Sequence, residues 1–249
     1  MSKSTSVIQD NIIKIVPLHT AKKTVTANPQ LTYRGGPLLA NVEVFTIFWG
    51  SSWSTRSAEM DHINSFFTAI LKSSLINQLN EYNANGFTLG NGTLNGTIVI
   101  NEKAPQKSIT DAKIQSQLQS WIKTNQSFPK PGANTLYFVY TDIGVTVSMG
   151  GSKSCSSFCG YHDATNNNLY YAVMPYPDCS GCLGGLAVQD ALTATSSHEL
   201  CEAITDPVPG SGWYDDNNGE IGDICAWKFK ELDGFKVQLE WSNNHNSCL

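Results

Sequence analysis

One short segment carries residue types that can bind a metal ion and act on metal-bound water. In His198-Glu199-Leu200-Cys201-Glu202, His198 and Glu202 lie four positions apart, so on a helix both side chains project from one face towards a single cation. Glu199 then lies beside the metal without having to bind it. A carboxylate in that place can take a proton from water whose pKa the cation lowers towards about 7. The segment therefore predicts a hydrolytic metal site with Glu199 as general base.

Two carboxylates further along the chain can supply a third ligand. Glu220 and Asp223 follow His198 by 22 and 25 residues and are three apart. On a helical segment they share a face, so one can bind the metal while the other holds a ligand in place. The pattern leaves the choice between them open. The neighbouring residues 215–219 are interpreted as a solvated turn, with a calcium-binding loop as the alternative.

Other features modify this interpretation. His-Glu-x-x-Glu also occurs on solvated helices that bind nothing, but residues 191–197 before the motif are small and weakly polar, as expected of a helix buried beside a cleft. His162 lies in a segment rich in Cys and Gly, which we interpret as a loop, and both a structural and a catalytic role are open for it. A nucleophile elbow of the form Gly-x-Ser-x-Gly is absent from the sequence, which argues against a serine hydrolase.

The elements that must position these residues follow from hydrophobic periodicity. Apolar and β-branched runs predict strands at 41–50, 97–101, 134–141, 168–175 and 234–241. Apolar residues at spacings of three and four predict a helix at 57–82. The Ser108-Ile109-Thr110-Asp111 sequence predicts the start of a second helix at 108–124, and a third helix is expected at 188–204, ending at Asp206-Pro207. We expect an α+β fold with a mixed sheet: a polar N-terminal arm over 1–33 and a single zincin-like domain over 34–249.

Composition and charge limit the classes of partner. The net charge of −5, without a Lys/Arg cluster beyond Lys22-Lys23, offers no surface for a polyanion such as nucleic acid. No stretch approaches the roughly 18 to 20 apolar residues that a membrane span needs. The polar start 1–10 has no apolar core of a signal peptide. If the protein is exported, we expect that a leader has been removed or that export uses another route.

Seven cysteines all lie in the C-terminal part of the chain, between Cys155 and Cys248. Three disulfides with one spare thiol would require an oxidising compartment. Alternatively, Cys155-x3-Cys159 and Cys179-x2-Cys182 would form a four-cysteine structural zinc site in a reduced cell. The spacing alone does not separate these alternatives.

Six motifs occur together in a fixed order from Arg34 to the C-terminus. They are Gly35-Gly36-Pro37-Leu38-Leu39, Cys155-x3-Cys159-Gly160-Tyr161-His162, Cys179-x2-Cys182, His198-Glu199-Leu200-x-Glu202, Trp213-Tyr214 and Glu220-Ile221-Gly222-Asp223-Ile224-Cys225. In this set the chain resembles the phosphate-induced, EXORDIUM-like protein family. The resemblance implies a secreted protein with a zincin-type His-Glu-x-x-Glu element, and it supplies a fold and a site more securely than a substrate.

The resemblance also bears on the cysteines, because the family carries six that match. It favours disulfides over structural zinc, and we expect the pairs Cys155–Cys159, Cys179–Cys182 and Cys225–Cys248. Cys201 departs from the family, which commonly has a small residue there, and we expect it to be the free, buried thiol. The lack of a visible signal sequence is a second departure.

We therefore expect a secreted, monomeric zinc metallopeptidase that acts on peptides or proteins. His198, Glu202 and one of Glu220 or Asp223 would bind zinc, and Glu199, with His162, would be catalytic. With one nitrogen and two carboxylate ligands, manganese, iron or calcium are also compatible.

Two alternatives belong to other classes. The first is a non-catalytic extracellular signalling or carbohydrate- or peptide-binding protein with a structural metal, whose groove would use exposed Trp53, Trp213, Tyr214 and Trp227. The second is a cytosolic four-cysteine zinc protein with no hydrolytic role.

Overall fold

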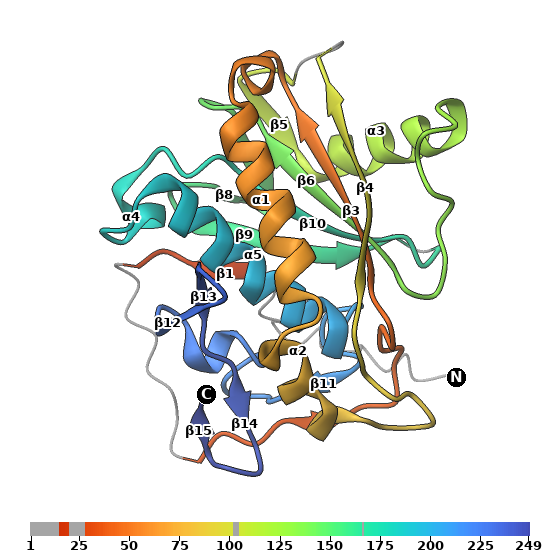
Figure 1. The fold of residues 1–249 in the computed structure, drawn as a ribbon, viewed down its shortest axis with the longest axis vertical. Helices are drawn as coiled ribbons and strands as arrows, with labels where there is room; N and C mark the ends of the chain where they lie inside the picture. Colours follow the sequence, from red (N-terminus) through yellow and green to blue (C-terminus); the bar gives the residue numbers. More distant parts are fainter. Residues whose placement is uncertain (1–14, 20–27, 102–104, 166) are drawn as a thin grey trace, which may run out of the picture.

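A six-stranded mixed sheet lies at the centre of the fold (Figure 1). The computed structural model describes residues 15–19, 28–101, 105–165 and 167–249. Along the sheet, the strands are β1 (Ile15–Pro17), β9 (Phe158–Ala164), β10 (Tyr170–Met174), β6 (Thr135–Thr141), β3 (Glu43–Trp49) and β4 (Thr93–Ile100). The four strands from β10 to β4 are parallel, whereas β9 runs antiparallel to both β10 and β1. The sheet therefore changes direction at β9.

Helices and small sheets surround this centre. The α-helices are α1 (Ser57–Ile70), α2 (Ser74–Gln78), α3 (Asp111–Thr124), α4 (Ser180–Leu183) and α5 (Val188–Thr205), and short 3-10 helices are η1 (Ser51–Thr55), η2 (Leu79–Tyr82) and η3 (Asp223–Cys225). The remaining strands pair as β2 (Thr32–Tyr33) with β11 (Trp213–Tyr214), β5 (Ser108–Thr110) with β7 (Thr146–Met149), β7 with β8 (Ser152–Lys153), β12 (Phe229–Leu232) with β13 (Phe235–Gln238), and β14 (Trp241–Ser242) with β15 (Ser247–Cys248). The chain is thus a mixed α/β protein, consistent with the α+β expectation.

The two faces of the sheet pack against different helices, because successive side chains of a strand point to opposite faces. Phe48 of β3 and Phe138 of β6 belong to the core that includes α1 and α5. Their neighbours Ile47 and Val139 belong to a second core, which contains Trp121 of α3. Figure 1 shows α1 and α5 crossing the near face of the sheet, with α3 behind it. The sheet is consequently buried on both sides.

The predicted strands at 41–50, 134–141 and 168–175 are confirmed as β3, β6 and β10, and the one at 97–101 is the end of the longer β4. The helix predicted over 57–82 is interrupted after Ile70, and α2 begins anew with the Ser73 hydroxyl accepting the Leu75 N–H at 3.2 Å. Residues 108–110, expected to be helical, form β5, and Thr110 caps α3. Strand β1 lies within the predicted N-terminal arm, most of which is outside the described residues.

Helix α5 is confirmed almost to the residue, and it is buried nearly all round from Ala191 to Thr205. Its small polar side chains bond to neighbours on both sides. The Ser196 hydroxyl lies 2.8 Å from the Tyr140 hydroxyl of β6, and the Ser197 hydroxyl accepts the Gln238 N–H of β13 at 2.9 Å. α5 is therefore held between the central sheet and the β12–β13 hairpin, and small residues allow both to approach closely.

The three disulfides differ in part from the expected pairing. Cys225–Cys248 is confirmed, and Cys201 is the free, buried cysteine among the described residues. The expected bridges Cys155–Cys159 and Cys179–Cys182 are wrong, because the structure pairs Cys155 with Cys179 and Cys159 with Cys182. The same bridges replace the four-cysteine zinc site, since sulfurs in a disulfide are not thiolate ligands.

The reason for the crossed pairing lies in local structure. Cys179 precedes α4 and Cys182 lies three residues later, so both project from one face of a helical turn. The Cys155 N–H donates to the Phe158 carbonyl at 3.0 Å, and this turn keeps Cys155 beside Cys159 at the start of β9. The two segments therefore face each other as pairs. Each bridge spans 23 or 24 residues, which corresponds to roughly 3 kcal/mol for a single bridge in the loop-entropy model.

Non-reducing peptide mapping tests this pairing. A protease that cuts before aspartate separates the two cysteine pairs, because Asp163 and Asp178 both lie between Cys159 and Cys179. We expect the fragment that contains Cys155 and Cys159 to remain linked to the fragment that contains Cys179 and Cys182 until a reductant is added. Two unlinked fragments, each with an internal bridge, would contradict the crossed pairing.

Candidate metal centre

Three segments bring ionisable side chains together in the interior. The second half of α5 presents His198, Glu199 and Glu202, β9 presents His162, and the loop that leads into η3 adds Glu220 with Asp223. These side chains are 0–1% exposed. Since isolated buried charges are strongly unfavourable, such a cluster requires protons or a cation between its members.

One part of the cluster centres on His198. Its Nε2 lies 2.9 Å from Glu202 Oε1, as the four-residue spacing predicts. The Asp223 N–H donates to the same Glu202 oxygen at 3.1 Å. Potential ligand atoms of His198, Glu202 and Asp223 all lie within 4.8 Å of one another. The sequence left open whether Glu220 or Asp223 is the third ligand. The geometry favours Asp223, because it is the one grouped with His198 and Glu202.

A second part centres on His162. Its Nδ1 lies 2.9 Å from Glu199 Oε2 and 3.6 Å from Glu202 Oε2, and its Nε2 lies 3.1 Å from the Asp206 carbonyl oxygen. Glu220 Oε1 is 3.4 Å from the same Nε2. The interpretation of this segment as a loop was wrong, because His162 belongs to β9, whose Cys and Gly residues obscured the strand pattern. The structure therefore places His162 in direct contact with the motif on α5.

Two glycines let backbone approach the cluster. A Cβ on Gly222 would lie 2.9 Å from His198 Nδ1 and 3.0 Å from Glu202 Oε1. Real Cβ atoms essentially never come within 3.0 Å of another atom, so any larger residue here would push the two segments apart. A Cβ on Gly160 would lie 2.7 Å from the Thr195 methyl group and 3.3 Å from Glu199 Oε1. Glycine at both positions allows the η3 loop and β9 to pack directly against α5.

Burial and neighbouring charges shift the pKa values of the cluster. Burial raises the pKa of Glu199 from 4.5 to about 7, against the lowering effect of its hydrogen bond to His162. Burial also raises the pKa of Glu220 well above its usual range. For His198, burial is the largest single effect and lowers the pKa, but the carboxylates of Glu202, Glu199 and Glu240 together outweigh it, so the net shift is upward. His162 behaves similarly, with Glu220 and Glu199 raising its pKa. All four shifts favour the protonated forms of these side chains, so the metal-free cluster binds more protons than the same residues would in the unfolded chain.

Asp206 and Glu240 were missed by the sequence analysis. Asp206 ends α5, and its carboxylate accepts the backbone N–H groups of residues 210, 211 and 212. Burial raises its pKa to about 6 despite these bonds. Glu240 is fully buried. Burial raises its pKa well above the usual range, and the nearby His198 offsets only part of this rise. Strand alternation over 234–241 would direct Glu240 to solvent, but the strand ends at Gln238, so the alternation does not extend to it.

The donor set fits a bound cation. Within the described parts of the chain, His198 Nδ1, Glu199 Oε1 and both carboxylate oxygens of Glu220 and of Glu240 are buried without a hydrogen-bond partner. Buried polar atoms normally have partners. Imidazole and carboxylate together suit zinc, manganese or iron. By contrast, both carboxylate oxygens of Asp215 accept N–H donors, at 2.7 to 2.9 Å from the backbone. Residues 215–219 thus form a turn as expected, but the expectation that it is solvated holds only in part, because Asp215 and Asn218 are buried.

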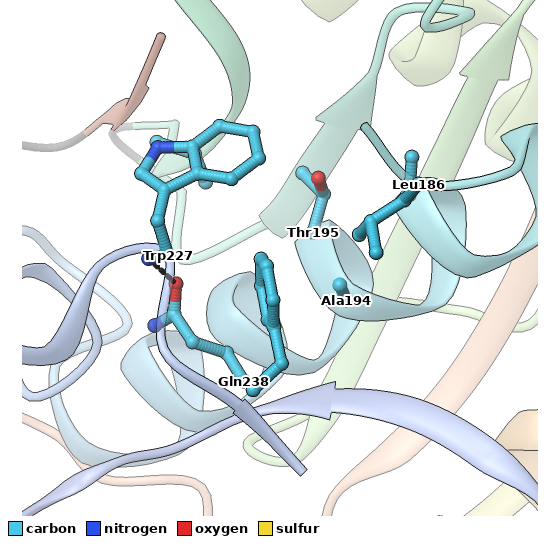
Figure 2. A pocket seen from close by; sticks show the side chains of 8 residues that line it. Leu186, Ala194, Thr195, Trp227 and Gln238 are labelled. Atoms are coloured by element: carbon cyan, nitrogen blue, oxygen red, sulfur yellow. Dashed lines mark hydrogen bonds between the residues drawn. The ribbon is translucent and has the colours of Figure 1, made fainter. Parts of the chain in front are cut away.

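A small pocket lies beside the first half of α5. Figure 2 shows Trp227 and Gln238 on one side of it and Leu186, Ala194 and Thr195 on the other. Val16, Ala191 and Phe229 complete the lining. None of the six clustered side chains of α5, β9 and the η3 loop is among these lining residues. In the described conformation, the cluster is therefore closed from this pocket.

The aromatic residues considered for a ligand groove are less exposed than expected. Trp53 and Tyr214 are buried in the core, so the expectation that they are exposed is wrong. Trp213 is half-buried and donates its indole N–H to the Tyr82 carbonyl at 2.7 Å. Trp227 is half-buried and bonds to the Pro17 carbonyl at 2.9 Å. These four residues do not form an exposed aromatic platform.

Comparisons with known proteins add no assignment. The chain matches no protein-family model, and no curated protein matches it significantly. Among the described residues, no helix is long and apolar enough to cross a membrane.

The raised pKa values predict an unusual pH dependence for the metal-free protein. Glu199 and Asp206 have folded pKa values of about 7 and about 6, above the ordinary 4.5 and 3.8, so the folded chain binds protons that the unfolded chain has released. This contribution to stability is full below about pH 4 and is lost as the pH rises through about 7. With a chelator present, the Tm should fall by more than about 5 °C between pH 5 and pH 8.

Added zinc should weaken or reverse this trend, because metal binding displaces the same protons and strengthens as pH rises. Circular dichroism melts with chelator or with zinc measure both effects. If the Tm of the chelated protein increases steadily over this pH range, the buried cluster is not protonated as described.

Proposed function

We propose that this protein is a metal-dependent hydrolase, with peptide bonds as the most suitable substrate class. The observation that carries the proposal is the geometry around α5: the ligand atoms of His198, Glu202 and Asp223 are gathered in one group, and Glu199 lies next to it in contact with His162. A carboxylate held beside a metal position is the arrangement that hydrolytic metal sites use.

Each residue has a distinct role in this proposal. His198, Glu202 and Asp223 would hold the metal, with Glu220 as the alternative third carboxylate. A bound zinc ion would lower the pKa of water and polarise a scissile carbonyl. Glu199 takes the proton from the attacking water and later delivers it to the leaving amine. His162 fixes the Glu199 carboxylate through the 2.9 Å contact and acts as a positioning residue.

Further properties are part of the same proposal. Zinc is the proposed metal, since imidazole with carboxylate is a common zinc ligand set. Three disulfides are typical of proteins from oxidising compartments and support an extracellular location. We also propose that the domain is zincin-like and related to the EXORDIUM-like proteins that its motifs resemble, with the His-Glu-x-x-Glu segment as its centre.

The complete burial of the cluster favours a second candidate function. His198, Glu199 and Glu202 are 0% exposed, and hydrolysis requires that part of the surrounding structure moves to admit a substrate. A metal enclosed in this way can instead stabilise the fold of a non-catalytic extracellular binding protein. Metal content is the same for both candidates, so only hydrolytic activity that depends on Glu199 separates them.

The Glu199→Gln variant tests the catalytic role. The amide is nearly isosteric, so the fold and the metal at His198 should be retained, while the loss of the base should lower hydrolysis by about 10²- to 10⁴-fold. Fluorescein-labelled casein and a mixture of synthetic peptides serve as probes. Glu231→Gln on the exposed face of β12 is the matched control and should keep full activity. Equal activity of Glu199→Gln and the parent would rule out Glu199 as the base, and an inactive parent would favour the structural candidate.

Substitution of the metal-binding residues tests the site itself. His198→Ala and Glu202→Ala should each lower the metal content measured by elemental analysis, because each removes one of about three protein ligands. Stability should also fall, by roughly 3 kcal/mol or more, because other buried charges lose their partner. His245→Ala, at an exposed histidine, is the control for metal content and should leave it unchanged. An undiminished metal content in both test variants would exclude α5 as the metal-binding element.

A further inference from the structure

We propose that the cluster binds a second divalent cation between His162, Glu199 and Glu202, so that Glu202 bridges two metal ions. This inference rests on the proposed function in so far as the first ion is the one held at His198. It extends that proposal, because it makes His162 a metal ligand and the centre a two-metal site.

The bonding of His162 is the first observation. Its Nε2 lies 3.1 Å from the Asp206 carbonyl oxygen, which can only accept a hydrogen bond, so this nitrogen carries the proton. In a neutral imidazole the lone pair is then on Nδ1 and faces Glu199 Oε2 at 2.9 Å and Glu202 Oε2 at 3.6 Å. Either a proton on Nδ1 or a cation must therefore lie between this nitrogen and the two carboxylate oxygens, and a cation at this place would have Nδ1, Glu199 Oε2 and Glu202 Oε2 as ligands. A histidine whose other ring N–H binds a carbonyl is the usual arrangement of a metal ligand.

The grouping of the potential ligand atoms is the second observation. Ligand atoms at about 2.0–2.2 Å from one ion are no more than roughly 4.4 Å apart. Among the described residues, three sets of atoms lie within 4.8 Å of one another, and one of these consists of disulfide cysteines. The other two are His162 with Glu199 and Glu202, and His198 with Glu202 and Asp223. The histidines fall in different sets that share Glu202, so the arrangement matches two ions better than one.

Charge balance is the third observation. Six carboxyl groups at the cluster are 0–1% exposed. The carboxylate of Asp206 accepts three backbone N–H groups, and the other five are Glu199, Glu202, Glu220, Asp223 and Glu240. When ionised they carry five negative charges, so one divalent cation leaves three of these charges and two cations leave one. Within the described chain, Glu199 Oε1 and both oxygens of Glu220 are buried without hydrogen-bond donors. A second cation beside Glu199 Oε2 would place positive charge close to these buried oxygens without binding them directly.

A two-metal centre would have defined chemical properties. Each ion would have one imidazole and two carboxylate ligands, a hard set that suits manganese, iron or zinc. Two-metal hydrolytic sites hold their ions about 3.5–4 Å apart and act on acyl or phosphoryl groups. In such a centre Glu199 would bind through Oε2, which leaves Oε1 to exchange a proton with the nucleophilic water.

Metal stoichiometry tests the proposal with a readout other than activity. Full-length protein, stripped with a chelator, is equilibrated with Mn²⁺, and bound metal is measured by equilibrium dialysis with elemental analysis. Manganese is chosen because it binds thiols weakly and therefore avoids Cys201. We expect two equivalents in the parent, one in His162→Ala, and two in the control His245→Ala. Electron paramagnetic resonance of the parent should show a spin-coupled manganese pair that is lost in His162→Ala.

Each outcome distinguishes the two proposals. One equivalent in the parent, with an uncoupled manganese signal, overturns the second cation but leaves the proposed function intact. Zero equivalents of both manganese and zinc overturn the proposed function as well. If His162→Ala does not fold, the stoichiometry and spin coupling of the parent still decide the question.

Discussion

The structure depends on the burial of several carboxylates and two histidines between α5, β9 and the loop that leads into η3. Each of these groups would be costly on its own in the interior. Together they form contacts of 2.9 Å between His198 and Glu202 and between His162 and Glu199. The excess of carboxylates over histidines remains, and protons or cations must balance it. This requirement connects the packing of the fold to its proposed chemistry.

The rest of the fold supplies the geometry that this cluster needs. Small side chains on α5 let the helix lie between the sheet and the β12–β13 hairpin, and Gly160 and Gly222 remove the side chains that would separate the three segments. In β9, which pairs with β10, His162 lies opposite Ala172 and contacts Glu199 of α5. Cys225–Cys248 ties the end of η3, and hence Asp223, to the C-terminal strand. Together, these features keep the carboxylates and histidines of the cluster in contact with one another.

Local patterns were sufficient for α5, because the spacing of His198 and Glu202 and the stop at Asp206-Pro207 are properties of adjacent residues. The buried strands β3, β6 and β10 were predicted for a similar reason, since their apolar runs are continuous. β9 was missed because Cys159, Gly160 and His162 weaken a strand pattern, although they are the residues that its contacts with α4 and α5 require. The disulfide pairing also depends on how α4 meets β9, and sequence proximity gave the wrong partners. Glu240 has no local signal at all, since its burial results from tertiary packing.

X-ray diffraction data collected at the absorption edge of zinc, from crystals of protein grown with zinc, would show whether α5 binds a metal ion through His198 and Glu202. We expect an anomalous peak within about 2.0–2.2 Å of a His198 nitrogen and a Glu202 oxygen, on the side of α5 that contacts Gly222 and Asp223. A well-ordered cluster with no such peak, in crystals that show zinc elsewhere on the chain, would contradict the assignment of α5 as the metal-binding helix.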